Sequence, residues 1–183
     1  MVLDTKIAGN RIYLQKLQKT FKQAEEFYNL VNNNKKHLYP FADWELNLNS
    51  PEDCYERIVS QYKNWEKGST YTYGIFDSDN KDMIGIIFAT HFSLVGKSTE
   101  LGYWIDMNHS GKGIIKEAIA ILEIEVFKNG IIKIIIKTDT ENTVSSSVAK
   151  SLGYELEGVL KKDQFVKSFN ELRDFNVFAK IKT

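Results

Sequence analysis

The 183-residue sequence predicts an α/β fold in which helices cover both faces of a mixed, mostly antiparallel sheet of about seven strands. Two observations favour this class. The spacing of apolar residues is helical in the first third of the chain, alternates with period two in the middle, and becomes helical again after residue 110. An apolar, β-branched run at 131–138 is typical of a central strand. The length and the absence of an internal linker predict one domain, residues 1–183.

The first third is predicted to contain a strand at 7–17 and helices at 20–31 and 50–67. Apolar residues three and four positions apart predict the first helix, and three consecutive asparagines at 32–34 are expected to end it. Ser50 as N-cap and Pro51 at the first helical position predict the start of the second helix, which follows an irregular aromatic stretch.

The middle third is predicted to form a three-stranded antiparallel meander and then a helix. Period-two alternation begins at Tyr71, and polar turns at 77–82 and 96–98 separate the strands. Helical spacing returns after Gly111, and Gly130 is expected to close that helix.

The last third is predicted to contain a buried strand, a short helix and two closing strands, at 131–138, 142–152, 154–160 and 172–181. The near-continuous apolar character of the buried strand predicts that it is covered on both faces. A strand–helix–strand crossover between about residues 100 and 139 predicts one parallel pair in the sheet.

Composition and charge exclude several classes of function. The 24 basic and 24 acidic residues give a formal net charge of zero, and only three of the basic residues are arginines, which argues against a generally basic nucleic-acid binder. A single cysteine, Cys54, excludes an internal disulfide and a Cys-based zinc site. His37 and His109 have no acidic or cysteine partner in the sequence pattern, so we predict no metal site and no direct nucleic-acid binding.

The sequence also bears on where the protein acts. No apolar run is long enough to span a membrane, and residues 1–10 lack the apolar core of a secretory signal. The single cysteine fits a reducing compartment. We therefore expect a cytoplasmic protein that does not insert into a membrane.

The segment 100–118 carries the most informative pattern, a strand that runs through a glycine loop into a helix. Gly111 and Gly113 would let the backbone approach a ligand closely, and the first N–H groups of a helix have no intrahelical acceptor. With the helix dipole they form a site for a phosphate-type anion, to which Lys112 adds a positive charge. The spacing matches neither a Walker loop nor a dinucleotide fingerprint. A plain glycine turn before a helix is the alternative.

Three later segments, residues 141–143, 149–154 and 156–160, complete a pattern. Together with the glycine loop they resemble the GNAT acyl-CoA N-acyltransferase superfamily. The ending at 169–175 resembles most the ribosomal-protein N-terminal acetyltransferases of the RimJ/RimL type. The resemblance covers about residues 71–182 and implies a GNAT-type sheet.

The resemblance implies acetyl-CoA as the cofactor. Its pyrophosphate would lie on the amides of the glycine loop, and its pantetheine arm would pair with the third meander strand where that strand separates from the buried strand. The residues that the resemblance assigns to the cofactor are Trp104, Ile105, Asp106, Gly111, Lys112, Gly113, Ile114, Ile115, Asn142 and Lys150.

Acyl transfer needs a neutral amine, a polarised thioester carbonyl and a proton for the leaving sulfur. The resemblance implies Ser145 as the proton donor, with helix capping as its alternative role. Where the subfamily has a glutamate base, this chain has Gln164, which cannot accept a proton, so Glu100 and Asp163 are the candidate bases. The residues expected at the acceptor are Tyr39, Phe41, Trp44 and His91.

The resemblance implies an acetyl-CoA-dependent N-acetyltransferase whose acceptor is a protein N-terminal α-amine. Two alternatives stay open at this point. One is a small-amine acceptor such as a polyamine, an amino acid or a drug, and the other is a non-catalytic sensor that binds acyl-CoA without turnover. Because such enzymes are commonly dimers, we also expect a homodimer.

Overall fold

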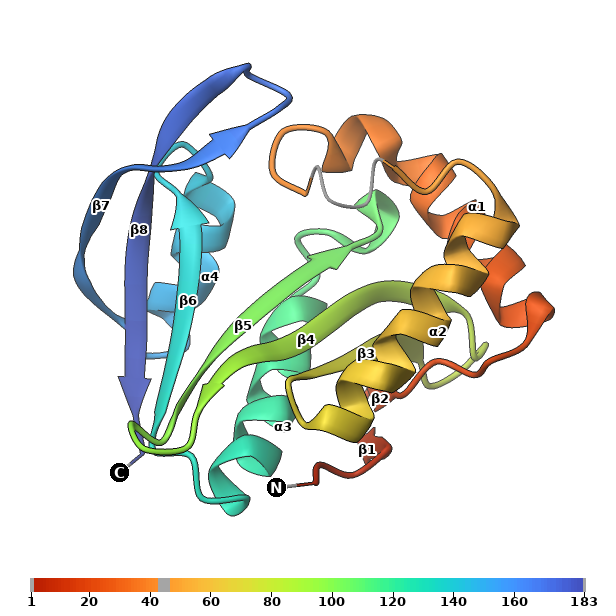
Figure 1. The fold of residues 1–183 in the computed structure, drawn as a ribbon, viewed down its shortest axis with the longest axis horizontal. Helices are drawn as coiled ribbons and strands as arrows, with labels where there is room; N and C mark the ends of the chain where they lie inside the picture. The colour runs from red at the N-terminus through yellow and green to blue at the C-terminus, as the bar shows by residue number, and fades with distance from the viewer. Residues whose placement is uncertain (1, 43–46, 183) are drawn as a thin grey trace.

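The computed structural model describes residues 2–42 and 47–182, which fold around one sheet of eight strands (Figure 1). The strands are β1 (Lys6–Ala8), β2 (Ile12–Gln15), β3 (Thr70–Asp77), β4 (Met83–Ser93), β5 (Ser98–Ile105), β6 (Lys133–Asp139), β7 (Glu155–Val166) and β8 (Glu171–Ile181). The helices are α1 (Phe21–Leu38), α2 (Pro51–Lys67), α3 (Ile114–Lys128) and α4 (Thr143–Ser151), with a short 3₁₀ turn, η2, at Met107–His109.

The strand order is β1-β2-β3-β4-β5-β6-β8-β7, and every pair is antiparallel except β5–β6. The mixed, mostly antiparallel sheet and its single crossover are thus confirmed. The sheet has one strand more than expected because residues 7–17 do not form one strand. The chain turns back at Gly9, whose N–H donates to the Ile12 carbonyl at 2.8 Å, and Ile7 pairs with Leu14.

The four helices cover the sheet on both faces, as the sequence predicts (Figure 1). On one face, Phe27 of α1 and Ile58 of α2 belong to a core cluster with Ile86 of β4. On the other face, Ile119 of α3 belongs to a second cluster with Ile134 of β6. The sheet therefore separates two layers of helices, and each layer has its own apolar core.

Helix α1 continues through the asparagines that were expected to end it. Asn34 is only 2% exposed, and its Nδ2 donates to the Leu30 carbonyl and to Asp106 Oδ1, at 2.9 and 2.8 Å. Its Oδ1 accepts the Met107 N–H at 2.8 Å. An asparagine interrupts a helix when its amide competes for the local backbone, and here the amide is occupied by the segment after β5. The predicted end was therefore wrong, and α1 is tied to the loop that follows β5.

Strands β6 and β7 also differ from the expectation. Ile134 and Ile136 of β6 are buried, but Lys133, Ile135 and Lys137 are partly exposed, so β6 is fully covered on one face only. Strand β7 extends to Val166, six residues beyond its predicted end. Most of its side chains are exposed, so its length is set by hydrogen bonding to β8 and not by an apolar pattern.

Strands β5 and β6 pair only at their beginning. Residues 98–100 lie beside residues 133–135, and from there the two strands diverge (Figure 1). Strand β5 stays paired with β4 as far as Ile105, and β6 stays paired with β8 as far as Asp139. The divergence leaves backbone groups of β5 without a strand partner at the centre of the sheet, and the candidate site lies there.

Candidate active site

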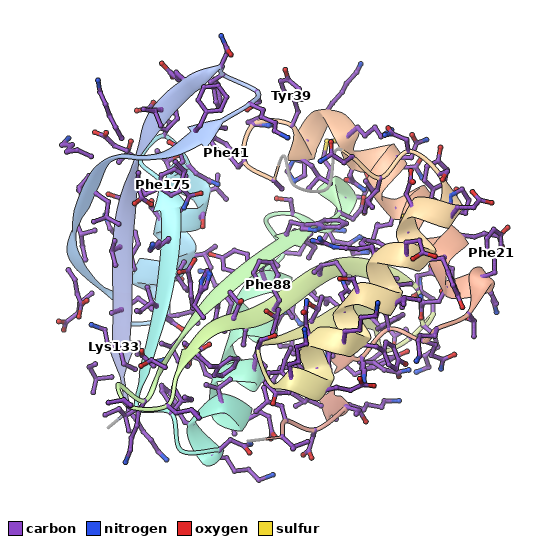
Figure 2. The ribbon with its side chains drawn as sticks, in the orientation of Figure 1. Phe21, Tyr39, Phe41, Phe88, Lys133 and Phe175 are labelled. Carbon is purple, nitrogen blue, oxygen red and sulfur yellow. The ribbon has the colours of Figure 1, made fainter. Side chains whose placement is uncertain are left out.

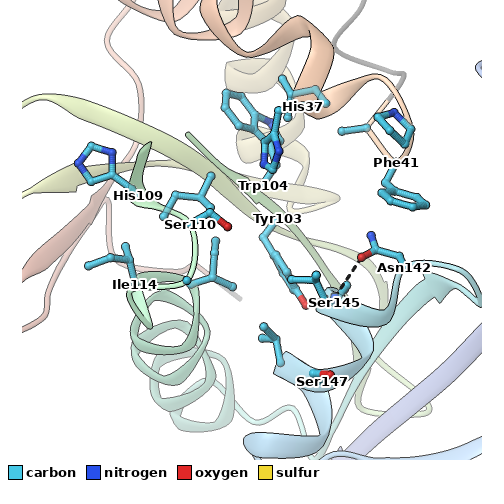
Figure 3. Close-up of a pocket in the computed structure, with 18 of the residues that line it drawn as sticks. His37, Phe41, Tyr103, Trp104, His109, Ser110, Ile114, Asn142, Ser145 and Ser147 are labelled. Atoms are coloured by element: carbon cyan, nitrogen blue, oxygen red, sulfur yellow. Dashed lines mark hydrogen bonds between the residues drawn. The ribbon is translucent and has the colours of Figure 1, made fainter. Parts of the chain in front are cut away.

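A cavity of about 770 Å³ opens where β5 and β6 diverge (Figure 3). Its walls come from four segments that are distant in sequence: the end of α1 with the loop after it, the end of β5, the glycine loop with the start of α3, and the start of α4. The cavity is thus formed at the sheet centre by the end of one helix and the N-terminal ends of two others.

The glycine loop has the geometry that the sequence predicts. Gly111 and Gly113 have φ angles of 75° and 76°, in the left-handed region that favours glycine. A Cβ placed on Gly111 would meet no atom within 4 Å, so the space above the loop is open. Gly113 is the N-cap of α3 and supplies no side-chain hydrogen bond, and Ile114 and Ile115 line the cavity. The loop therefore offers a helix N-terminus to an anion.

Arg11 supports this loop by hydrogen bonding, and the sequence analysis did not identify it. Its Nη1 donates to the Lys112 carbonyl at 2.9 Å, and its Nε donates to Glu117 Oε2 at 2.8 Å. Burial opposes the ionisation of Glu117, but hydrogen bonds from the Arg11 backbone and guanidinium outweigh it and lower the pKa of this carboxyl. Because about a hundred residues separate the partners, no local pattern could have indicated the contact.

Asp106 supports the other side of the loop. Its carboxylate accepts hydrogen bonds from Asn34 and from His109 Nδ1, the latter at 2.7 Å. Burial opposes the ionisation of Asp106, but these hydrogen bonds outweigh it and lower its pKa. The expectation that His109 has no acidic partner is wrong, because the 3₁₀ turn brings it back onto Asp106.

The backbone of β5 is also oriented for a ligand. The Asp106 N–H donates to the Ile84 carbonyl of β4 at 2.8 Å. Because successive residues of a strand point their amide groups to opposite edges, the N–H and C=O groups of Ile105 and Tyr103 point into the gap. Trp104 and Ile105 line the cavity, as expected, whereas Asp106 is engaged by α1 and η2.

Two hydroxyl groups meet at the centre of the gap. Asn142 is the N-cap of α4, and its Oδ1 accepts the Ser145 N–H at 3.0 Å (Figure 3). The capping role therefore belongs to Asn142, and the Ser145 hydroxyl lies 3.0 Å from the hydroxyl of Tyr103. Burial raises the Tyr103 pKa, so its phenol stays protonated. The sequence analysis did not identify Tyr103, because it lies within a strand and no recognisable motif surrounds it.

A second cavity of about 180 Å³ shares Tyr103, Asn142 and Ser145 with the first. Its apolar lining includes phenylalanines from four segments: Phe41, Phe88, Phe165 and Phe175. Figure 2 shows Phe41 and Phe175 near the upper end of the gap and Phe88 lower, over the central strands. The shared residues therefore stand between a cavity beside the glycine loop and an aromatic cavity.

Two carboxylates line this second cavity, those of Glu100 and Asp139. Asp139 is already held by Arg173, whose Nε lies 2.9 Å from its Oδ2. Glu100 has a weaker partner in His91, whose Nδ1 lies 3.4 Å from its Oε2. The side chain of His91 is 76% exposed against 22% for Glu100. Glu100 therefore faces the cavity, and His91 contacts it from the solvent side.

The other candidate base lies beside the cavity. Asp163 is exposed and is not part of the cavity wall, and its Oδ2 lies 4.0 Å from Lys137 Nζ. Its neighbour Gln164 does line the cavity and donates Nε2 to the same Oδ2 at 3.3 Å. The structure thus brings Glu100 to the aromatic cavity and leaves Asp163 outside it.

Four further residues were expected at the site, but they lie away from the two cavities or are not among the residues that the structure describes. Lys112 and Lys150 are exposed and line neither cavity, and Lys116 lines the first cavity in their place. Tyr39 is half exposed at the end of α1 and does not line either cavity. Trp44 lies outside the described residues.

The chain is similar to known acetyltransferases in both sequence and structure. A family model described as an acetyltransferase (GNAT) domain matches residues 11–155. The ribosomal-protein-serine acetyltransferase of Escherichia coli K12 is 30% identical, over 86% of this chain and 87% of the relative. The solved structure of the microcin C7 self-immunity acetyltransferase MccE in complex with acetyl-CoA and AMP has a TM-score of 0.87 at 26% identity, over 94% of this chain and 93% of that chain. RimL, a ribosomal L7/L12 α-N-protein acetyltransferase in complex with coenzyme A, has a TM-score of 0.88 at 24% identity, over 96% and 97%.

Proposed function

The chain belongs to the GNAT acetyltransferase family, and we propose that it transfers an acetyl group from acetyl-CoA to the N-terminal α-amine of a protein. Family membership makes it an N-acetyltransferase, and the proposal concerns the acceptor and the residues that act on it. The observation that carries it is the meeting of two cavities at Tyr103 and Ser145, one beside a glycine loop and one beside a carboxylate. The similarity to a ribosomal-protein-serine acetyltransferase supports a protein as the acceptor.

The first cavity fits the cofactor of the family. The open space above Gly111 and the N-terminus of α3 suit a pyrophosphate, and the gap-facing backbone of Tyr103 and Ile105 suits the amide groups of a pantetheine arm. When bound, acetyl-CoA supplies the acetyl group as an activated thioester. Asn142 lines both cavities, and its Nδ2 is available as a donor while Oδ1 caps α4.

The proposed mechanism assigns one proton carrier to each cavity. Glu100 takes the proton of the acceptor ammonium in the aromatic cavity, directly or through water, and His91 helps to hold its carboxylate in place. On the opposite wall, the Ser145 hydroxyl holds the proton that the leaving sulfur needs. The Tyr103 hydroxyl lies 3.0 Å away and can donate a proton back to Ser145. The N–H groups of β5 that point into the gap can stabilise negative charge on a carbonyl oxygen.

Turnover separates this enzyme from a non-catalytic sensor. The purified chain is incubated with acetyl-CoA and a library of peptides that carry free N-termini, and the release of free thiol is followed. We expect release that depends on the peptide. Binding of acetyl-CoA without thiol release above the background rate would instead support the sensor.

We predict that this enzyme acetylates α-amines faster than lysine ε-amines. A lysine side chain has a pKa near 10.4, so about four in ten thousand are neutral at pH 7, whereas an α-amine of pKa about 7.7–8.0 is neutral in roughly 10–17% of molecules. A strong base would have to offset about 3–4 kcal/mol for lysine. Glu100 shares a cavity wall with Gln164, which cannot act as a base. Mass-spectrometric mapping on one peptide with both amines measures the preference, and predominant ε-acetylation would overturn it.

We also predict that Gln164→Glu raises the rate, most visibly below pH 7.5, where neutral amine is scarce. The new carboxylate would line the aromatic cavity beside Asp163, and a like charge at that distance raises a carboxyl pKa and makes a better base. Gln164→Met is the matched control, because it keeps the length of the side chain and cannot accept a proton. A rate that rises equally in both variants would contradict the assignment.

A small-molecule amine is the second candidate acceptor. The four phenylalanines of the second cavity suit a planar ring, and a similar acetyltransferase of solved structure holds AMP together with acetyl-CoA. Including nucleosides and amino acids that carry amines in the thiol-release assay compares the two acceptor classes directly. A rate with a small amine above that of every peptide would favour this second candidate.

Location and assembly stay predictions. Among the residues that the structure describes, no helix is long and apolar enough to cross a membrane. Strand β7 forms an edge of the sheet and exposes Leu156 and Leu160, which supports contact between two copies of the chain. Sedimentation velocity measures the expected homodimer, and cell fractionation measures the expected cytoplasmic location.

A further inference from the structure

A third cavity, of about 270 Å³, lies under α2 on the same face of the sheet as Glu100. We call it the α2 subsite, and its polar wall consists of Arg57, Ser60, Gln61, Asn64, Thr70, Thr72 and Thr90. Phe88, labelled in Figure 2, lines both this cavity and the aromatic cavity. Thr90 is the direct cross-strand neighbour of Glu100. The α2 subsite therefore adjoins the place assigned to the acceptor amine.

Two polar side chains of this wall, Gln61 and Thr72, belong to largely buried residues, but their polar atoms open onto the cavity. Gln61 is 8% exposed and Thr72 is 7% exposed. Within the described ranges, neither the Gln61 amide nor the Thr72 hydroxyl makes a hydrogen bond. Polar atoms that line a cavity can hydrogen-bond to water or to the polar atoms of a ligand. Thr70 and Thr90, by contrast, satisfy each other at 2.8 Å. The cavity therefore offers the polar groups of Gln61 and Thr72 to a ligand with polar atoms.

The charge of the wall indicates the kind of ligand. Arg57 is its only charged residue in the part of the chain that is described, and no described carboxylate lies within ion-pair distance of its guanidinium. Arginine, asparagine, glutamine and threonine all offer N–H or O–H donors, and no carboxylate of the described residues lines the cavity. A carboxylate accepts hydrogen bonds only and pairs well with a guanidinium.

We propose that the α2 subsite binds a carboxylate of the acceptor while the acceptor amine lies beside Glu100. The subsite makes the enzyme selective for acceptors in which a carboxylate lies a few residues' length or less from the reacting amine. The carboxylate is an aspartate or glutamate side chain near the N-terminus of a protein, or the carboxylate of a small amino acid. This inference rests on the proposed transfer to an amine and adds the chemistry by which the acceptor is selected.

The first test compares matched peptides with a serine N-terminus that carry either Glu or Gln at position 2, 3 or 4. We expect kcat/KM to be higher for the Glu peptide by about threefold or more at one of these positions, because a charge pair with the solvent-exposed Arg57 is lost with Gln. Arg57→Gln is expected to bring the Glu-to-Gln ratio close to one. Lys63→Gln is the matched control, since it removes one positive charge from an exposed position of α2 outside the cavity, and it should keep the ratio.

The second test does not depend on turnover. Calorimetric titration compares binding of the same Glu and Gln peptides with acetylated N-termini to the wild type, Arg57→Gln and Lys63→Gln. We expect the Glu preference to appear in the wild type and in Lys63→Gln only. Gln61→Leu should also weaken binding of the Glu peptide, because it removes an amide that lines the cavity.

Each outcome decides a different claim. Equal binding of the Glu and Gln peptides to the wild type overturns the α2 subsite, whatever the turnover. A Glu preference in binding without acetylation of any amine supports the subsite and contradicts the proposed function. Free serine and serine amide as acceptors separate the two sources of the carboxylate, since a preference for free serine without a Glu preference among the peptides assigns the subsite to a small acceptor.

Discussion

Replacement of Gly111 by valine is expected to weaken acetyl-CoA binding by about tenfold or more, because hydrogen bonds from backbone amides to a charged phosphate are lost or lengthened. Gly111 has a φ of 75°, and its Cβ position opens onto the space where the pyrophosphate would lie. A β-branched side chain would fill that space and would also disfavour the left-handed conformation. Calorimetric titration with acetyl-CoA measures the affinity.

Gly130→Val is the matched control for this prediction. Gly130 follows the end of α3, has a φ of 92°, and also has no atom within 4 Å of its Cβ position. Both variants carry the same conformational strain, of roughly 1–2 kcal/mol, and both should show a similar loss in thermal stability. Only Gly111→Val should lose affinity for the cofactor. Unchanged affinity in Gly111→Val would mean that the loop is a plain helix start.

Replacement of Ser145 by alanine is expected to lower kcat about a hundredfold, which lies within the contribution of a general acid. The Ser145 hydroxyl lies 3.0 Å from the Tyr103 hydroxyl at the boundary of the two cavities. Tyr103→Phe should lower kcat less, because Tyr103 acts through Ser145. Burial raises the Tyr103 pKa, so the hydroxyl pair stays protonated and the loss should be equal at pH 7 and pH 9. Steady-state kinetics at both pH values measures it.

The control for this prediction is Ser151→Ala on the same helix. Ser151 is exposed, its Oγ donates to the Val148 carbonyl at 2.8 Å, and it lines neither cavity. It should keep the wild-type kcat. The cap of α4 comes from Asn142, so Ser145→Ala should leave thermal stability and cofactor affinity nearly unchanged. A stability loss without a loss of kcat would give Ser145 a structural role instead.

Much of the fold could be predicted because it depends on local rules. Helix α2 begins at Pro51 after a Ser50 cap and closes at Gly68 in the left-handed conformation, as the spacing indicates. The glycine loop before α3 could likewise be predicted, since positive φ angles and a bare helix N-terminus follow from glycines at those positions. These features require only neighbours within one turn.

Other features failed where a distant group changed the outcome. Helix α1 passes through its asparagines because Asn34 bonds to Asp106, 72 residues away. Strand β7 extends beyond its apolar pattern because β8 supplies hydrogen bonds to an exposed edge. In both cases a tertiary partner satisfied polar groups that local reasoning had assigned to a helix end or a loop.

The sequence by itself determined the sheet-and-helix class, the crossover, the glycine loop and the presence of Ser145 and Asn142 at the start of a helix. The tertiary structure alone decided that Tyr103 meets Ser145, that Arg11 supports the loop, and that Glu100 rather than Asp163 lines the aromatic cavity. The reason is physical: periodicity and capping act over a few residues, whereas these contacts depend on where β5 and β6 diverge and on which edge and face each side chain then occupies.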